Sequence, residues 1–170
     1  MYLKLPLDGD ITVTFRIREY DHKITASDDW CVVDLLVKKP GVLNYELYED
    51  EALEGHEVRK IKDLIEATIN EEDAKAFEPL EPYMVFEPGK DPIHLIWKIY
   101  IWSGVEHNTD STIDLYLLQE DMEGLLKYLK YTTGEYKIES VRDLIDEGII
   151  VEDDGKAWRQ KQLDGSCKYQ

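Results

Sequence analysis

The chain is poor in cysteine and in positive charge. Its 170 residues include two cysteines, Cys31 and Cys167, too few for the disulfide framework of a small secreted protein. Lys and Arg number 20 against 37 Asp and Glu, so the formal net charge at pH 7 is -17. A field this negative repels nucleic-acid phosphates and anionic lipids and attracts cationic proteins. The composition argues against a nucleic-acid partner and favours a basic protein, although acidic charge also serves solubility alone.

Long hydrophobic runs and targeting signals are missing as well. No run approaches membrane-spanning length, and residues 1–6 lack the basic and then apolar pattern of a signal peptide. We therefore expect a cytoplasmic protein with no membrane partner. Hydrophobic residues make up 43% of the chain and fall in patterned runs, which predicts a folded domain with its excess charge on the surface.

Catalytic and cofactor-binding motifs are also absent from the sequence. There is no G-x-S-x-G elbow, and no glycine-rich loop joins a strand to a helix. The histidines are scattered, and His56, between Glu54 and Glu57, is the best metal candidate among them. We expect no catalytic residue, no cofactor and no metal. A hydrolase that uses carboxylates, with a metal at His56, remains the enzyme alternative.

The first half of the chain shows three strand patterns and then a helix pattern. In residues 11–17, apolar residues alternate with Thr and Arg, the period of a half-buried strand. Similar runs at 30–37 and 42–48 flank a Pro-Gly turn signal, which predicts a hairpin. In residues 57–70, apolar residues recur on one helical face, which predicts an amphipathic helix.

The second half repeats this order. Strand patterns occupy residues 83–86, 94–102 and 113–117, and a second amphipathic helix is predicted for 120–132. An α+β fold satisfies this plan: one mainly antiparallel sheet, built from two strand-strand-strand-helix halves, with both helices on one face.

We place the boundary of this domain at residues 1–134 and treat 135–170 as a C-terminal appendage. Ser140 and Asp143 predict a short helix through Glu147. Residues 149–151 and 156–158 are expected to pair across an Asp-Gly turn, followed by a frayed tail.

An acidic stretch runs from the third predicted strand into the first predicted helix and contains no Lys or Arg. Its acids are Glu46, Glu49, Asp50, Glu51, Glu54 and Glu57. A second cluster, Glu71 to Asp73, follows the helix. A solvated connector explains the first cluster in part, because acids suit a helix N-terminus. The second cluster lies at the unfavourable C-terminal end, which favours a functional acidic surface.

The mixed faces of two strands in the second half offer another candidate surface. Opposite the apolar positions lie His94, Ile96, Lys98, Tyr100 and Trp102 on one strand, and Thr112, Asp114 and Tyr116 on the next. Exposed Tyr and Trp among polar groups are typical of interface hot spots. Alternatively, the C-terminal segment folds back over this face with Trp158 as its anchor, or the aromatic pairs serve the sheet alone.

Several short motifs together resemble the WapI-type immunity proteins of bacteria. They are Asp28-Asp29-Trp30 at the start of an apolar strand, the Glu-Pro segment at 77–86, and a later strand with a central Trp, here Trp97. The resemblance covers residues 11–129. The segment after Ser140 lies outside it, and the Glu-Pro is doubled in this chain.

The resemblance implies a small cytosolic protein that occludes a cognate toxin, often a nuclease with a basic surface. An acidic inhibitor associates quickly with such a target. We therefore expect a non-enzymatic inhibitor, a monomer or weak dimer, that binds the C-terminal domain of a toxin. The residues expected to contact it are Glu46, Glu49, Asp50, Glu51, Glu54, Tyr100, Trp102 and Tyr116. The alternative is an adaptor or regulatory protein for a basic cellular partner.

Overall fold

The computed structural model describes residues 1–21, 29–91, 94–101 and 111–152. Within these ranges the chain has the expected α+β fold, with antiparallel strands and three helices. The strands form two sheets, one of five strands and one of three. No helix of the described residues is both long and apolar enough to span a bilayer.

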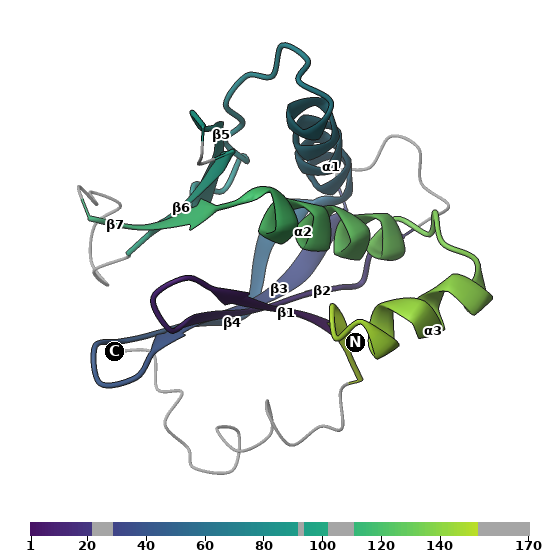
Figure 1. Cartoon of the computed structure of the whole chain (residues 1–170), viewed down its shortest axis with the longest axis horizontal. Coiled ribbons are helices and arrows are strands. Elements are labelled where there is room, and N and C mark those ends of the chain that lie inside the picture. Colours follow the sequence, from purple (N-terminus) through teal and green to yellow (C-terminus); the bar gives the residue numbers. More distant parts are fainter. Residues whose placement is uncertain (22–28, 92–93, 102–110, 153–170) are drawn as a thin grey trace.

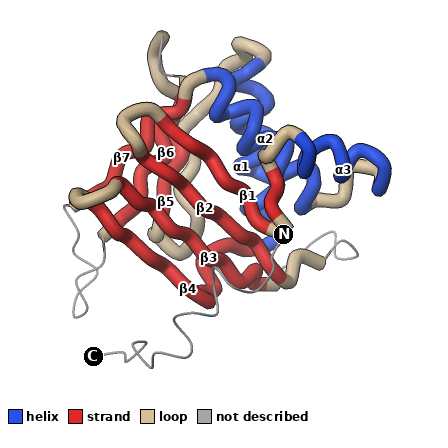
Figure 2. The backbone as a smooth tube through the Cα atoms, turned by 60° about the horizontal axis from the view of Figure 1, so that its bottom comes forward, coloured by secondary structure: helices blue, strands red, loops and turns tan. Residues whose placement is uncertain are grey.

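The large sheet has the strand order β4-β3-β2-β1-β8, and its neighbouring strands are antiparallel. Figure 2 shows β4, β3, β2 and β1 side by side. Its strands are β1 (Tyr2–Leu7), β2 (Ile11–Arg18), β3 (Trp30–Lys39), β4 (Leu43–Glu54) and β8 (Ile150–Val151). Alternate residues of β1 and β2 are buried, as the period-two pattern predicts. One face of the large sheet therefore belongs to the core.

The small sheet has the order β5-β6-β7 and is also antiparallel. Its strands are β5 (Met84–Pro88), β6 (Leu95–Tyr100) and β7 (Thr112–Leu117). Outside β5, Phe77 forms an isolated antiparallel bridge with Phe86, in which each amide nitrogen lies 2.9 Å from the other residue's carbonyl oxygen.

Two long helices and one short helix complete the fold: α1 (Gly55–Ile69), α2 (Gln119–Thr132) and α3 (Ile138–Asp146). Acids three residues beyond the N-caps accept hydrogen bonds from the cap amides of α1 and α2, where orphan backbone donors collect. Glu57 accepts from the amide of Glu54 at 2.9 Å, and Asp121 accepts from the amide of Leu118 at 3.0 Å.

The small sheet, α1 and α2 lie on the same face of the large sheet (Figure 1). Between these layers, the Trp97 ring stacks on Phe86 with centroids 5.2 Å apart and meets the edge of Phe15 at 5.1 Å. Phe15 also contacts the ring of Tyr128 on α2 at 5.9 Å. A single aromatic cluster thus joins both sheets and one helix.

The expectation of one sheet was wrong, because the second set of strands stacks on the first instead of extending it. Both sheets have an apolar inner face, and stacking buries both faces in one core. β1 was also missed. Its apolar residues alternate, but Pro6 weakened the strand pattern. The structure tolerates Pro6 because β8 pairs only with Tyr2 and Leu3, at the far end of β1.

β4 extends well beyond the predicted residues 42–48, so the acidic stretch is mostly strand and not connector. Register shifts opposite Cys31/Val32 and Val33/Leu35 mark bulges in its pairing with β3. Beyond the expected boundary at 134, the predicted short helix is present as α3. The following strand, β8, pairs with β1. Residues 156–158, its expected partner, lie outside the described part of the chain.

Candidate partner-binding surfaces

The bulges in β4 distribute its acids over two faces of the large sheet. Residues paired across antiparallel strands point to the same face. Glu46 pairs with Leu36 and Glu51 with Val32, which places both acids on the outer face. Asp50 pairs with Val33, whose side chain is in the core, so Asp50 lies on the inner face at the sheet edge. The predicted acidic cluster is therefore not one patch.

Asp50 joins the two sheets. It accepts a hydrogen bond from the hydroxyl of Tyr83, beside β5. Burial and then the Asp50 charge raise the pKa of Tyr83, and the same two causes raise the pKa of Tyr45 to about 12. Tyr45 also places its hydroxyl 3.5 Å from the carbonyl oxygen of Tyr100. Two predicted partner-binding residues thus take part in this contact between the sheets: Asp50 through Tyr83 and Tyr100 through Tyr45. We call the group Tyr45, Asp50, Tyr83 and Tyr100 the tyrosine seam.

Glu54, another predicted contact, is 8% exposed and belongs to a cluster with His56 and Glu57. Its Oε2 lies 3.1 Å from Nδ1 of His56. Glu57 accepts from the amide of Glu54 through Oε2 and from the amide of Leu80 through Oε1, at 2.6 Å. The two Glu57 oxygens therefore bind two backbone amides, one at the positive end of α1 and one in the segment before β5.

Among the described residues, this cluster is the one group of three or more His, Cys, Asp or Glu side chains whose potential metal-ligand atoms all lie within 4.8 Å of one another. These three side chains are the residues that could hold a divalent cation. The carboxylate of Glu57, however, already accepts hydrogen bonds at the start of α1 and from the loop at Leu80. These bonds provide a sufficient structural reason for the burial of Glu57.

The remaining predicted acids differ in their surroundings. Glu51 is exposed, whereas Glu46 is half-buried and accepts a hydrogen bond from Nδ2 of Asn44 at 3.1 Å. Glu49 lies in β4, and its side chain is outside the described part of the structure. Of the acids in this stretch, Glu51 has the clearest access to a partner.

The mixed face of the small sheet has the predicted composition. Tyr116 lies opposite Ile96, and Thr112 lies opposite Tyr100. The Tyr116 side chain is 52% exposed, while Tyr100 is half-buried. Trp102, the third predicted aromatic contact, lies outside the described residues, as does the segment with Trp158 that was considered as a cover.

Charged residues cross the middle of this face. Lys98 forms an ion pair with Glu87 at 2.8 Å and lies opposite Asp114 on β7. The hydroxyl of Thr112 donates to Oδ1 of Asp114 at 2.7 Å. These carboxylates raise the pKa of Lys98, with the Glu87 hydrogen bond as the first cause. The face combines one exposed Tyr with a row of alternating charges, Glu87, Lys98 and Asp114, which ends in an acid on β7. We call these three residues the charge row.

Sequence reasoning missed a buried ion cluster on the large sheet. Asp34 of β3 is fully buried and accepts from Nε of Arg16 at 2.7 Å and from Nε of Arg18 at 3.2 Å. The available signal was an Asp inside an apolar strand beside two alternating Arg on the neighbouring strand. The single carboxylate of Asp34 thus serves as the shared counter-ion of two Arg side chains.

Two open cavities lie beside α2. One, of about 380 Å³, lies at the end of β2 and includes Arg16, Arg18, Tyr20 and Tyr131 in its lining. The other, of about 310 Å³, lies between β1, the start of α2 and the turn before β8. Asp34 already pairs with both Arg side chains of the first, and Glu147 pairs with Lys127 of the second at 2.7 Å.

No protein-family model, curated protein or solved structure matches this chain.

Proposed function

We propose that this chain is a non-enzymatic acidic binding protein that neutralises a basic protein partner. In the form suggested by the resemblance to WapI-type immunity proteins, it acts in the bacterial cytoplasm on the C-terminal domain of a cognate toxin. The observation that carries the proposal is the surplus of exposed carboxylates that remains after internal pairing.

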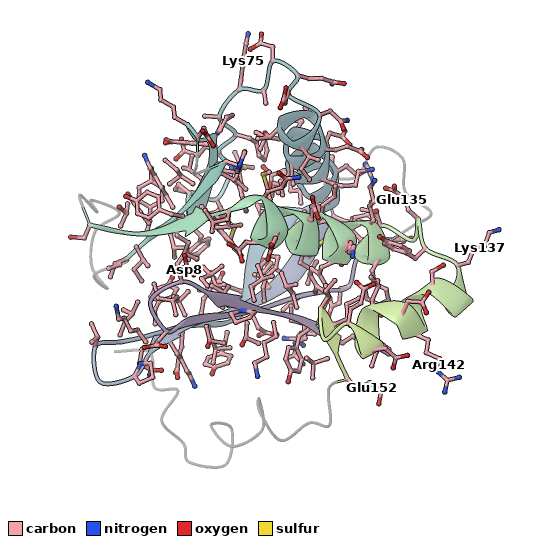
Figure 3. The ribbon with its side chains drawn as sticks, viewed as in Figure 1. Asp8, Lys75, Glu135, Lys137, Arg142 and Glu152 are labelled. Carbon is pink, nitrogen blue, oxygen red and sulfur yellow. The ribbon has the colours of Figure 1, made fainter. Side chains whose placement is uncertain are left out.

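Internal ion pairs engage several of the basic side chains in the described residues. Lys62 pairs with Glu135, Lys127 with Glu147 at 2.7 Å, and Lys130 with Glu66 at 2.5 Å. Arg16 and Arg18 share the buried Asp34. Figure 3 shows Lys75, Lys137 and Arg142 projecting from the outer ends of the structure, on loops and on α3.

The uncompensated charge is therefore carried by exposed acids around the molecule. They include Asp8, Asp10, Glu51, Glu71, Glu72, Asp73, Glu120 and Glu123. Such a distribution accelerates encounter with a cationic protein and disfavours anionic partners. Solubility alone also benefits from it, so a binding experiment must decide.

Two tyrosines of the small sheet supply the aromatic contact area that an interface needs in addition to charge. Tyr116 is exposed on β7, and Tyr100 lies on the neighbouring strand beside the seam with Asp50. A Tyr side chain buries a large apolar area and loses little conformational entropy when it does so, and its hydroxyl can still hydrogen-bond. These properties explain why Tyr is frequent at hot spots. Steering by acids and anchoring by Tyr together support binding over catalysis.

A pull-down of the tagged full-length chain from a lysate of its source, washed at low and at high salt, tests the proposal. We expect one dominant basic partner that is lost at high salt, because exposed charges are screened. A matched variant replaces Glu71 and Glu72 by Gln and Asp73 by Asn. It removes three negative charges and leaves the tyrosines unchanged, so it tests whether capture depends on the acidic charge. Capture that is independent of salt and of charge contradicts the proposal.

The identity of the partner then separates a toxin inhibitor from an adaptor. A nuclease or other toxin domain, encoded beside this chain and inhibited by it, supports immunity. A basic housekeeping protein supports the adaptor alternative. Inhibition of the purified toxin domain at stoichiometric amounts is the direct functional measurement.

A further inference from the structure

The two sheets have four edges, and three of them are poorly suited to accept another strand. β4 carries two register shifts and a series of acids, devices that protect an edge. β8 has only two residues. The β5 edge is occupied by the bridge between Phe77 and Phe86. Among the described residues, this leaves β7 as the regular edge.

β7 pairs with β6 over six residues, from Thr112 to Leu117, with no register shift. The amide of Ile101 donates to the carbonyl of Ser111 at 3.0 Å, which marks that pair as hydrogen-bonded. Because such pairs alternate along an antiparallel ladder, Ile113, Leu115 and Leu117 face β6 with their backbone groups.

The amides and carbonyls of Thr112, Asp114 and Tyr116 consequently point away from β6. No strand or bridge of the described residues lies on that side. Exposed apolar groups accompany this edge, since Tyr116 is 52% and Leu118 is 38% exposed. A regular edge with these properties is a template for a further strand.

The charge row across the small sheet indicates which strand fits. Lys98 of β6 lies opposite Asp114 of β7, so the row runs from a cation to an acid toward the open edge. A Lys or Arg in the next strand continues the alternation of sign. A second copy of this chain fits poorly, because each copy carries a formal charge of -17 and would present another acidic β7.

We propose that an extended, basic segment of the partner pairs with β7 and adds a fourth strand to the small sheet. This inference rests on the proposed function, since it names how the basic partner is held. Main-chain hydrogen bonds to Thr112, Asp114 and Tyr116 supply affinity. A cationic side chain beside Asp114 supplies register, and Tyr116 packs on the neighbouring residue of the added strand.

Amide hydrogen exchange in the full-length chain tests the pairing directly. The probe is a synthetic peptide in which Val and Lys alternate, so that Lys faces Asp114 while Val extends the apolar face. Without the peptide, the amides of Thr112, Asp114 and Tyr116 should exchange faster than those of Ile113 and Leu115. With it, their exchange should slow by about tenfold or more.

Two controls separate strand pairing from simple charge attraction. The first is the same peptide with alternate amides N-methylated, which keeps the charge and blocks the pairing. It should bind roughly tenfold more weakly, because several backbone hydrogen bonds are lost. The second is the pair Thr112→Pro and Thr112→Val. Pro removes an outward amide at the first residue of an edge strand, where Pro is tolerated, and Val keeps that amide.

Thr112→Pro should weaken peptide binding several-fold relative to Thr112→Val, and Asp114→Asn should lower its salt dependence. Peptide binding without slowed exchange at the three amides overturns the pairing. Slow exchange in the free chain also overturns it: if it depends on concentration, a second copy covers the edge, and if not, residues 153–170 or another part of the chain cover it. Failure of the proposed function is seen separately, as a pull-down with no basic partner.

Discussion

The backbone amide of Ile17 donates a hydrogen bond to the hydroxyl of Tyr128 at 2.8 Å, inside the core. This bond connects β2 to α2 across 111 residues of sequence. Burial raises the pKa of Tyr128, so its hydroxyl stays protonated at neutral pH. The helix is thereby fixed over the large sheet at a defined point.

Replacing Tyr128 by Phe leaves the Ile17 amide buried without this acceptor. We expect the free energy of unfolding to fall by about 1–3 kcal/mol, the cost of an unsatisfied buried donor. Tyr131→Phe, on the same helix but only half-buried, should change it by less than about 0.5 kcal/mol. Urea denaturation followed by circular dichroism measures both, and equal values contradict the role of this bond.

Asp34→Asn should destabilise the chain strongly, since it leaves Arg16 and Arg18 without their buried counter-ion. Removing one partner of a buried ion pair costs roughly 3–5 kcal/mol. The control is Asp63→Asn, which removes an exposed acid 3.5 Å from Lys62 and should cost between about 0 and 1 kcal/mol. A small effect of Asp34→Asn in chemical denaturation refutes a structural role for the cluster.

Trp97 is fully buried, and its Nε1 has no hydrogen-bond partner in the described structure. Trp97→Phe removes this donor together with part of the ring volume, so the two effects oppose each other. We expect a net loss below about 1.5 kcal/mol, against roughly 3–5 kcal/mol for Trp97→Ala, which leaves a cavity. Similar losses of unfolding free energy for both variants would show that the unpaired indole nitrogen does not destabilise the native state.

The tyrosine seam predicts a loss of stability at alkaline pH. The pKa of Tyr45 rises from 10.0 to about 12, and that of Tyr83 also rises. The unfolded chain therefore loses these protons first, so the free energy of unfolding should decline as pH rises from 10 to 12. Below pH 10 this contribution is fully present.

Tyr45→Phe should flatten the alkaline decline, because one group whose pKa changes on folding is removed. Asp50→Asn should flatten it less, since burial outranks the Asp50 charge among the causes. Denaturant midpoints measured across this pH range provide the test. An unchanged decline in Tyr45→Phe excludes Tyr45 as its source.

Association with the captured partner should depend on Glu51, the exposed acid on the outer face of β4. Glu51→Lys should slow association by several-fold at low salt and leave dissociation nearly unchanged, as rim charges do. Asp63→Lys, which reverses an exposed acid on α1, is the control for net charge. Equal slowing by both variants points to a general field and removes Glu51 from the interface.

The helices and the face composition of the second half were predictable from local periodicity. α1 and α2 end within two residues of the predicted bounds, since apolar spacing and acidic first turns identify them. The partners Ile96 and Tyr116 share a face as expected, because alternation determines which side chains point together.

The separation into two sheets and the distribution of the acids were not predictable in this way. Strand alternation does not reveal whether β5 joins β4 or stacks above it. The bulges of β4 move Asp50 inward and Glu51 outward, although the residues are adjacent and chemically alike. Only the pairing of β4 with β3 determines that Asp50 contacts Tyr83 and that Glu51 faces solvent.

β8 joins β1 through Tyr2 with Val151 and Leu3 with Ile150, residues from opposite ends of the described chain. Forming contacts this distant in sequence costs the loop-closure entropy of nearly the whole described chain, and this cost comes before the contacts stabilise the fold. During folding, the large sheet is therefore complete only when β8, the last described strand, has joined β1. Until then, β1 presents an unprotected edge, and its alternating leucines depend on α2 for cover.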